Sequence, residues 1–493
     1  MKIYSLYGAW RKVYKNMTSG FKGVVSTPIL FIFLQISAIN AAEDELKLDD
    51  LIQGFEETSP TNSQDNIDDL LQGFEDTPQI INQTKQTPTA KNWSLVTLSS
   101  LSGSYNYQHQ APAADETDYR GLSRLKFKIQ PEFRYKFTPK WDSVISASAF
   151  YDFAYSINGR SDYTSETLDR YESELELREA YLRGTVQSSL DIKLGRQIVV
   201  WGKSDSIRVV DVLNPLDFRE PGMVDIEDLR LPVSMLKTDY YFKQWNLSTI
   251  IIPEIRFNKM PAYGSDFYVS ENQQPTEIKP DHIRDPEFAL ALEGIFSGWD
   301  LSFYLARYYD DQTHMIVNEN NKPIRMEHSH LSMLGMASNV ALGDWLIKTE
   351  AALIDGLEFA KSDNSFRRAD LLLGVDYAGF TDQTITLEAV NRHLLNYDNA
   401  LSQSPDQTKE NEGQITFRYS GAFLRDKLQI IATASILGTD LDGGAFYRGS
   451  AEYEIANATS ITLGGIVYQS GENFLLENIA QNDRVFFDFR YSF

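Results

Sequence analysis

The sequence predicts an all-β protein whose strands close into a transmembrane antiparallel up-and-down barrel of about 18 strands, with 16 as the alternative count. Three observations lead to this prediction. From residue 93 onward apolar and polar residues alternate, no apolar run there is long enough for a membrane helix, and short connections alternate with long ones. Alternation places apolar side chains on one face of each strand. A membrane helix needs about 20 consecutive apolar residues, whereas strands of a membrane barrel are half apolar.

The final strand, residues 483–493, shows the alternation most clearly. One of its two columns of side chains is wholly apolar and consists of Val485, Phe487, Phe489, Tyr491 and Phe493. The other column is polar apart from one phenylalanine. This segment resembles the closing strand of bacterial outer-membrane β-barrels, in which the last residue is usually Phe. The resemblance implies that the apolar column contacts outer-membrane lipids and that the barrel-assembly machinery reads Phe493 together with Tyr491.

The same alternation continues upstream. In residues 124–137 it is interrupted by Pro131, which lacks a backbone N–H and therefore predicts a bulge. Four other strands begin with tryptophan directly after a short turn, at Trp141, Trp245, Trp299 and Trp345. Tryptophan at one fixed height is typical of the interfacial belt of a membrane barrel.

Connection lengths support the same architecture. Long connections are expected at 109–120, 156–170, 202–230, 257–283, 310–326, 394–410 and 470–482, with two briefer ones near 359–365 and 438–444. Short turns at one end and long loops at the other are typical of membrane barrels. An even strand count places both termini at the short-turn end, so we expect the long loops outside the cell and the N-terminal extension in the periplasm.

The N-terminus carries an export signal. Five basic residues precede the short apolar run 28–38, and Ala41 and Ala42 follow it. This order predicts a secretory signal peptide over residues 1–42. An uncleaved anchor helix is the alternative, but the apolar run is short for a membrane span. The expected domains are thus the signal, a tether over residues 43–92 and a barrel over residues 93–493.

The tether is acidic, has the composition of a disordered linker and contains a duplicated motif. Residues 49–56, Asp-Asp-Leu-Ile-Gln-Gly-Phe-Glu, recur at 68–75 as Asp-Asp-Leu-Leu-Gln-Gly-Phe-Glu. Two copies of a binding motif raise the effective concentration at one partner. We expect a periplasmic or inner-membrane transporter as that partner, unless the segment is a simple spacer. The apolar residues expected to contact it are Leu51, Phe55, Leu70 and Phe74.

Three short motifs lie between residues 195 and 215: Gly195-Arg-Gln, Trp201-Gly and Asn214-Pro. With the tether motif, they resemble a family of uncharacterised porin-like outer-membrane barrels that is distantly similar to alginate-export porins. The resemblance implies a location and an architecture, and it does not imply a substrate.

Arg196 follows Leu194 in a column that is predicted to face lipid. A charge in the middle of the bilayer is costly, so we expect a bulge that turns Arg196 inward, or a position at the outer rim. The loop 202–230 that follows is interpreted either as a constriction folded into the lumen or as an ordinary external loop. The constriction candidates are Arg196, Lys203, Asp205, Arg208 and Asp211.

The polar column predicts a lumen wall of mixed charge. The basic candidates, which are expected near the seam, are Arg124, Lys126, Lys128, Arg134, Arg484 and Arg490. The acidic candidates are Glu174, Glu176, Glu350 and Asp370, with Asp376, Glu388, Glu452 and Glu454 in the same column. Such a wall produces a transverse field that orients a charged or dipolar solute. A solvated or purely structural charge network is the alternative.

Several classes of function are disfavoured. The net charge of −23 argues against a nucleic-acid partner, and the absence of cysteine excludes thiolate chemistry and disulfides. No phosphate-binding loop, serine elbow or zinc motif occurs, so we predict no enzyme, cofactor or metal site. The favoured function is a porin-like channel for passive or facilitated passage of small solutes. The alternative is a docking component of an envelope transport or export system, recruited through the N-terminal repeats.

Overall fold

A computed structural model describes residues 91–112, 116–224, 226–270, 273–280, 285–318, 322–360, 362, 364–403 and 408–493. The predicted signal peptide and nearly all of the tether, including the four docking candidates, lie outside these residues. In the described ranges, no helix has the length and apolar character needed to cross a membrane.

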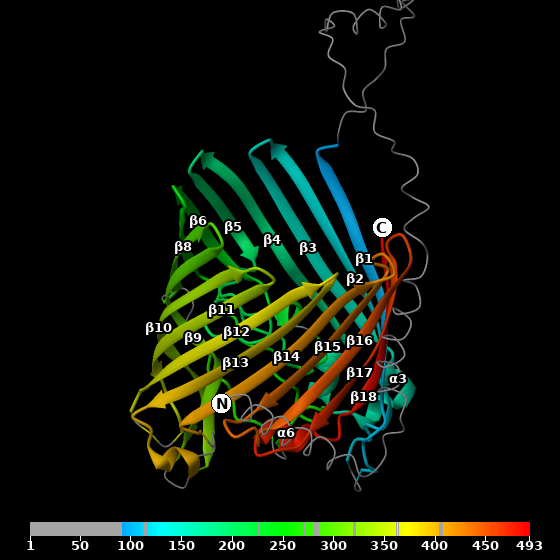
Figure 1. Cartoon of the computed structure of the whole chain (residues 1–493). Coiled ribbons are helices and arrows are strands. Elements are labelled where there is room, and N and C mark those ends of the chain that lie inside the picture. Colours follow the sequence, from blue (N-terminus) through cyan, green and yellow to red (C-terminus); the bar gives the residue numbers. More distant parts are fainter. Residues whose placement is uncertain are drawn as a thin grey trace, which may run out of the picture. The chain divides into compact units, whose positions relative to one another are not determined.

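The described chain contains eighteen β-strands that follow one another in an antiparallel sheet (Figure 1). They are β1 (Trp93–Asn106), β2 (Gly121–Thr138), β3 (Trp141–Asp152), β4 (Ser173–Gln187), β5 (Leu190–Gln197), β6 (Val233–Phe242), β7 (Trp245–Ile252), β8 (Glu287–Phe296), β9 (Trp299–Val317), β10 (Pro323–Leu342), β11 (Trp345–Leu357), β12 (Phe366–Phe380), β13 (Gln383–Leu395), β14 (Asn411–Phe423), β15 (Leu428–Leu437), β16 (Gly444–Ala456), β17 (Thr459–Gln469) and β18 (Arg484–Ser492). The short helices are α3 (Ala154–Asn158), η3 (Arg160–Asp162), α4 (Ser165–Tyr171), α5 (Ile226–Leu229), η4 (Asn399–Gln403) and α6 (Phe474–Ile479).

The last strand closes the barrel. β18 pairs with β1 from Leu98↔Ser492 to Asn106↔Arg484. The C-terminal residue continues this ladder, because the N–H of Phe493 donates to the oxygen of Thr97 (3.0 Å) and the N–H of Thr97 donates back (2.8 Å). A closed sheet leaves no row of unpaired backbone groups toward lipid. The predicted barrel of about 18 strands is confirmed.

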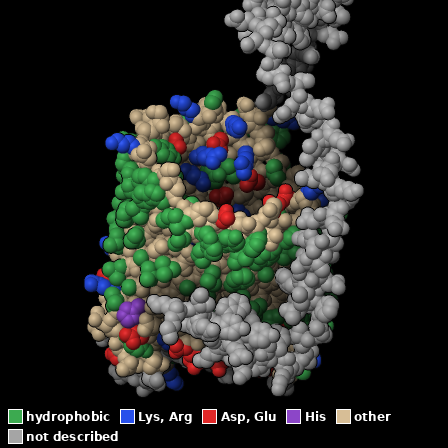
Figure 2. All heavy atoms as spheres, in the orientation of Figure 1, with side chains coloured by type: hydrophobic (Ala, Val, Ile, Leu, Met, Phe, Trp, Pro, Cys, Tyr) green, Lys and Arg blue, Asp and Glu red, His purple; other side chains and the backbone are tan. Residues whose placement is uncertain are grey.

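The two faces of the wall differ as the alternation predicts. On β9, Phe303 and Leu305 are 42% and 51% exposed, whereas the intervening Tyr304 is buried on the inner face. Figure 2 shows hydrophobic side chains gathered over the outer wall and charged side chains inside the barrel where it is hollowed at one end. The apolar face is therefore available to lipid.

A charge on the outer face is expected to prevent stable insertion. Phe303→Arg, midway along the lipid-facing part of β9, should destabilise the inserted barrel by about 2–4 kcal/mol. Urea unfolding in lipid vesicles measures this loss. Gln312→Arg, on the exposed part of the same strand beyond the apolar face, is the control and should leave stability unchanged. Equal stability of both variants would contradict a lipid-facing Phe303.

Short and long connections alternate as predicted, with one exception. The eight connections at one end have two to four residues, and the long connections lie at the other end. The predicted long loop 310–326 is wrong, because β9 continues to Val317, β10 starts at Pro323, and pairs such as Met326↔Met315 extend the ladder. Polar residues on both faces are typical of a loop. A strand that continues beyond the bilayer can be polar on both faces.

Pro131 does not produce the predicted bulge. The pairing of β2 with β3 keeps one register on both sides of it, at Ile129↔Ala149 and Glu132↔Ser146. The register shift in this region lies between Ile145 and Ala147, on the side of β3 that pairs with β4. Proline lacks one ladder donor, and the wall accommodates this loss by omitting pairs at residues 130 and 131.

Candidate functional site: the lumen and its inward loops

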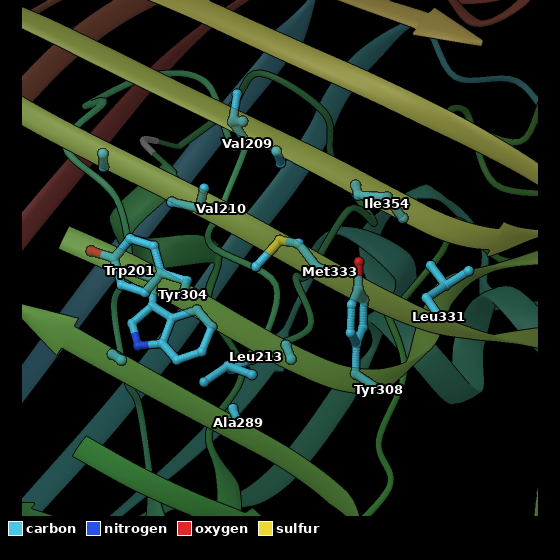
Figure 3. Packing of buried hydrophobic residues seen from close by; sticks show 14 of the residues in the cluster. Trp201, Val209, Val210, Leu213, Ala289, Tyr304, Tyr308, Leu331, Met333 and Ile354 are labelled. Carbon is cyan, nitrogen blue, oxygen red and sulfur yellow. The ribbon is translucent and has the colours of Figure 1, made fainter. Parts of the chain in front are cut away.

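Two long connections fold into the barrel. We call residues 198–232, between β5 and β6, the first inward loop, and residues 253–286, between β7 and β8, the second inward loop. The first loop buries apolar side chains against the inner wall (Figure 3). The ring of Trp201 lies 4.7 Å from the ring of Tyr304 on β9, and Val210 packs in the same cluster as Ile354 on β11. This apolar cluster therefore fills one side of the lumen.

Two buried glutamates hold the backbone of the first inward loop. Glu350 on β11 accepts hydrogen bonds from the N–H groups of Lys203 (2.5 Å), Ser204 (2.8 Å) and Val210 (3.4 Å). Successive N–H groups of a turn form an anion-binding concavity, and here a carboxylate of the wall occupies it. Glu350 is 1% exposed, so these donors satisfy a charge that would otherwise be costly to bury.

Glu388 on β13 binds the same part of the first inward loop. Its carboxylate accepts from the Ser204 hydroxyl (2.7 Å) and from the N–H groups of Asp205 (2.9 Å) and Ser206 (3.1 Å). We call Glu350 and Glu388, with the backbone that they bind, the carboxylate clamp. It fixes the start of the first inward loop to the wall formed by β11 and β13.

Gly202 is required beside the clamp. Its φ of +88° lies in the left-handed region, and an added Cβ would lie 2.6 Å from Oε1 of Glu350. Gly202→Ala is expected to displace Glu350 in addition to the backbone strain of about 1–2 kcal/mol. Gly298→Ala is the matched control, because its φ is +83° with no atom within 4 Å of the added Cβ. Thermal unfolding in detergent should show a larger loss for Gly202→Ala, and equal losses would contradict the predicted displacement.

The remaining constriction candidates also make internal contacts. Lys203 pairs with Asp300 on β9 at 2.9 Å, and Asp205 pairs with Lys348 on β11. Asp211 lies 3.4 Å from Arg208 and also pairs with Arg230. These charges thus tie the first inward loop to itself and to the wall.

The far end of the first inward loop reaches the opposite wall. Glu220 pairs with Arg124 on β2, and Arg219 pairs with Glu174 on β4 at 2.9 Å. The hydroxyl of Tyr468 on β17 donates to the oxygen of Pro221 (2.5 Å). In a ring of eighteen strands, β11 and β2 are nine positions apart in either direction. The loop therefore crosses the lumen between opposite walls.

The contact between Glu220 and β2 is charged at neutral pH. Burial opposes ionisation of Glu220, but the Arg124 guanidinium and the Lys126 ammonium hold its pKa well below the ordinary range. A carboxyl group with a depressed pKa stabilises the folded state above its ordinary pKa and loses that contribution as the pH falls through the folded value. The Glu220–Arg124 contact therefore stabilises the loop at neutral pH and weakens only in acid.

The second inward loop crosses the lumen as well. Lys259 pairs with Glu176 on β4 (2.8 Å), and Asp266 pairs with Arg484 at the start of β18 (2.9 Å). Phe257 stacks on His328 of β10, with ring centres 3.3 Å apart. The two inward loops also bond to each other, because the N–H of Lys259 donates to the oxygen of Leu216 (2.9 Å). Together they form one layer across the lumen.

A comparison with protein families shows which family the chain belongs to. Residues 75–493 match a family described as "Protein of unknown function (DUF1302)". The chain belongs to this family. Membership agrees with the predicted uncharacterised family, whereas the likeness to alginate-export porins stays a prediction. A search of curated proteins finds no match.

Solved structures show the same architecture as this DUF1302 protein. OccAB1 of Acinetobacter baumannii matches with a TM-score of 0.50 at 9% identity, covering 82% of this chain and 96% of that one. OccAB2 of the same organism (TM-score 0.49, 10% identity) and OccK1 (OpdK) of Pseudomonas aeruginosa (0.47, 10%) each cover 82% of this chain and 98% of their own. At 9% identity the likeness to OccAB1 shows the fold alone, which is a porin-like β-barrel.

Half of the ten residues predicted to line the pore of the DUF1302 barrel contact the inward loops. Arg124, Glu174, Glu176, Glu350 and Arg484 are all anchors of this kind. Asp370 instead pairs with Arg368 at 2.8 Å and lies 4.0 Å from Arg392, whose guanidinium donates to the oxygen of Arg208.

The other basic candidates form no ion pair with an inward loop among the described residues. Arg134 pairs with Glu132 at 2.6 Å, and Arg490 pairs with Asp488 at 3.0 Å, both in half-exposed positions. Lys126 and Lys128 lie on the inner face of β2, between the exposed Phe127 and Ile129. Of the ten predicted pore-lining residues, these four contact neither inward loop through an ion pair within the described part of the chain.

Arg196 is directed away from lipid. Its guanidinium pairs with Glu254 of the second inward loop and lies 4.0 Å from Glu176, and its side chain is 17% exposed. Gly195 immediately before it has a φ of +125°, and an added Cβ would lie 2.2 Å from the oxygen of Ala180. Glycine thus permits the backbone turn that brings Arg196 to these carboxylates.

Sequence reasoning missed the second inward loop as part of the site. Its anchors Arg256, Lys259 and Asp266 lie in a segment taken for an external loop, and nothing in their spacing indicates an inward path. The number of charged and aromatic residues in this loop is a signal that could have been used. A loop with many such residues is expected to contact other parts of the protein. Within the described residues, no group of three or more His, Asp or Glu side chains is placed to hold a metal ion.

Proposed function

We propose that this protein is an outer-membrane channel through which small polar solutes pass, passively or by facilitated diffusion, with the inward loops narrowing the route. The first inward loop carries the proposal, because buried charges hold it across the lumen between opposite walls. A barrel of 16–18 strands encloses an aqueous lumen, so a layer across it sets the size and chemistry of the passing solute. The likeness in fold to OccAB1 is compatible with this function.

Single-channel recording tests the proposal directly. Purified protein added to a planar lipid bilayer should produce discrete conductance steps, and vesicles that contain it should swell in small sugars but not in large ones. Heat-unfolded protein is the control. Folded, inserted protein that gives neither steps nor swelling would overturn the proposal.

The outer-membrane location and the assembly role of the C-terminus belong to the same proposal. The rings of Tyr491 and Phe493 are exposed on the outer face with centres 5.6 Å apart, so they are accessible to a partner before closure. Deleting Phe493 should lower the amount of folded barrel in the outer-membrane fraction. Normal accumulation of the truncated chain would contradict a role in assembly.

A docking role is the second candidate, favoured by the duplicated motif in the tether. A periplasmic or inner-membrane transporter that binds Leu51, Phe55, Leu70 and Phe74 would be held close to the channel. Deleting residues 43–92 separates the two functions. A simple channel keeps both its conductance and its cellular phenotype, whereas a docking component keeps conductance and loses transport.

A further inference from the structure

We propose that the channel carries small anions with a carboxylate or phosphate group along one side of its lumen, where four cations form a row. The cation row consists of Lys126 and Lys128 on β2, Arg178 on β4 and Lys193 on β5. This inference rests on the proposed channel function and adds the class of solute.

The strand register places the row inside the barrel. Lys126 and Lys128 alternate with the exposed Phe127 and Ile129, and Lys193 immediately precedes the exposed Leu194. Lys193 lies directly opposite Arg183 of β4 on one side and Lys237 of β6 on the other. Residues directly opposite in an antiparallel sheet share a face, so three cations stand side by side there.

The cations of the row differ from the neighbouring cations Arg183 and Lys237, which are paired with carboxylates. Arg183 pairs with Asp142 at 2.8 Å, and Lys237 pairs with Asp239 at 2.5 Å. Within the described part of the chain, by contrast, none of the four cations in the row forms an ion pair with a carboxylate. Carboxylates farther away still attract the three lysines, namely Glu220 for Lys126, Asp228 for Lys128 and Glu179 for Lys193. The row is thus a stretch of the wall whose cations have no directly paired carboxylate.

Aromatic rings position two of these cations without neutralising them. The ammonium of Lys126 lies 4.5 Å from the centre of the Phe150 ring, and that of Lys193 lies 3.8 Å from the centre of the Tyr181 ring. A ring attracts a cation through its quadrupole and carries no net charge. Each ammonium is therefore held in place while its charge stays available to a passing anion.

The charges of the row reinforce one another. Lys128 is repelled by Lys126 and Arg178, with Asp228 of the first inward loop as a nearby attraction. Like charges on a low-dielectric wall focus the field and raise the local concentration of the opposite ion.

The ratio of anion to cation permeability tests this proposal. The reversal potential in a potassium chloride gradient, and then with phosphate and gluconate, gives this ratio for wild type and for Lys128→Gln/Arg178→Gln/Lys193→Gln, which leaves Lys126 beside Glu220 in place. We expect the triple variant to lose anion preference several-fold while its permeability to neutral sugars is unchanged. An unchanged ratio would overturn the inference.

A matched control removes three positive charges from the long connections instead. Arg120→Gln/Arg160→Gln/Lys409→Gln changes exposed cations that pair with Asp118, Glu172 and Glu472, and its permeability ratio should equal that of wild type. An equal loss in both variants would assign the selectivity to net charge and not to the row.

If the triple variant of the row does not insert, the permeability ratio of Lys193→Glu is the test of the row. Absence of conductance in wild type refutes the channel itself, and retained conductance with an unaltered ratio refutes the row alone.

Discussion

Removal of both glutamates of the carboxylate clamp, in Glu350→Ala/Glu388→Ala, is expected to release the first inward loop and raise single-channel conductance. Five backbone N–H groups and the Ser204 hydroxyl would lose their acceptors. Each buried donor left unpaired costs about 1–3 kcal/mol, so the loop would gain by moving its backbone into water. Single-channel recording should show larger and noisier steps, and protease should cleave near residues 203–210.

Glu452→Ala/Glu454→Ala is the matched control for the clamp. It removes the same number of inner-wall carboxylates, but neither of these forms an ion pair or a hydrogen bond with an inward loop among the described residues. Step size and protease resistance should stay those of wild type. If the clamp variant behaves in the same way as this control, then the clamp does not hold the loop in the lumen.

Arg484→Ala is expected to have the second large effect, on the second inward loop. Arg484 is 1% exposed, pairs with Asp266 at 2.9 Å, donates to the oxygen of Asn482 (3.0 Å) and lies over the ring of Phe267. Truncating one partner of a buried ion pair costs about 3–5 kcal/mol, because the other charge stays buried without a partner. Urea unfolding and proteolysis within residues 253–280 should both show this loss.

Arg490→Ala provides the comparison on the same strand and the same face. Arg490 is 45% exposed and pairs with Asp488 at 3.0 Å. Exposed ion pairs contribute about 0–1 kcal/mol, so stability should change little. Equal effects of the two substitutions would mean that Arg484 does not anchor the second inward loop.

The barrel could be predicted from the sequence because its cause is local. Alternation between neighbours such as Phe303 and Tyr304 defines two faces wherever the strand lies, and the short turns give the connectivity. The direction of the Arg196 side chain could also be predicted, because a charge is costly in lipid and the side chain is therefore expected to turn away from it. Local rules failed at residues 310–326, where a strand leaves the bilayer and its apolar column ends.

The layer across the lumen could not be predicted in the same way. Glu350 has the sequence signature of a charge that faces water, yet its partners are backbone N–H groups some 140 residues earlier in the chain. Backbone donors have no residue signature, so spacing and composition do not reveal them. The same holds for Asp266 and Arg484, which are brought together only when the barrel is complete.

The seam between Thr97 and Phe493 fixes the order of events during biogenesis. Because Phe493 completes the pairing of the first strand, β1 keeps an open hydrogen-bonding edge until β18 has docked. A chain cut short anywhere in β18 would keep that edge exposed and recruit other chains to it.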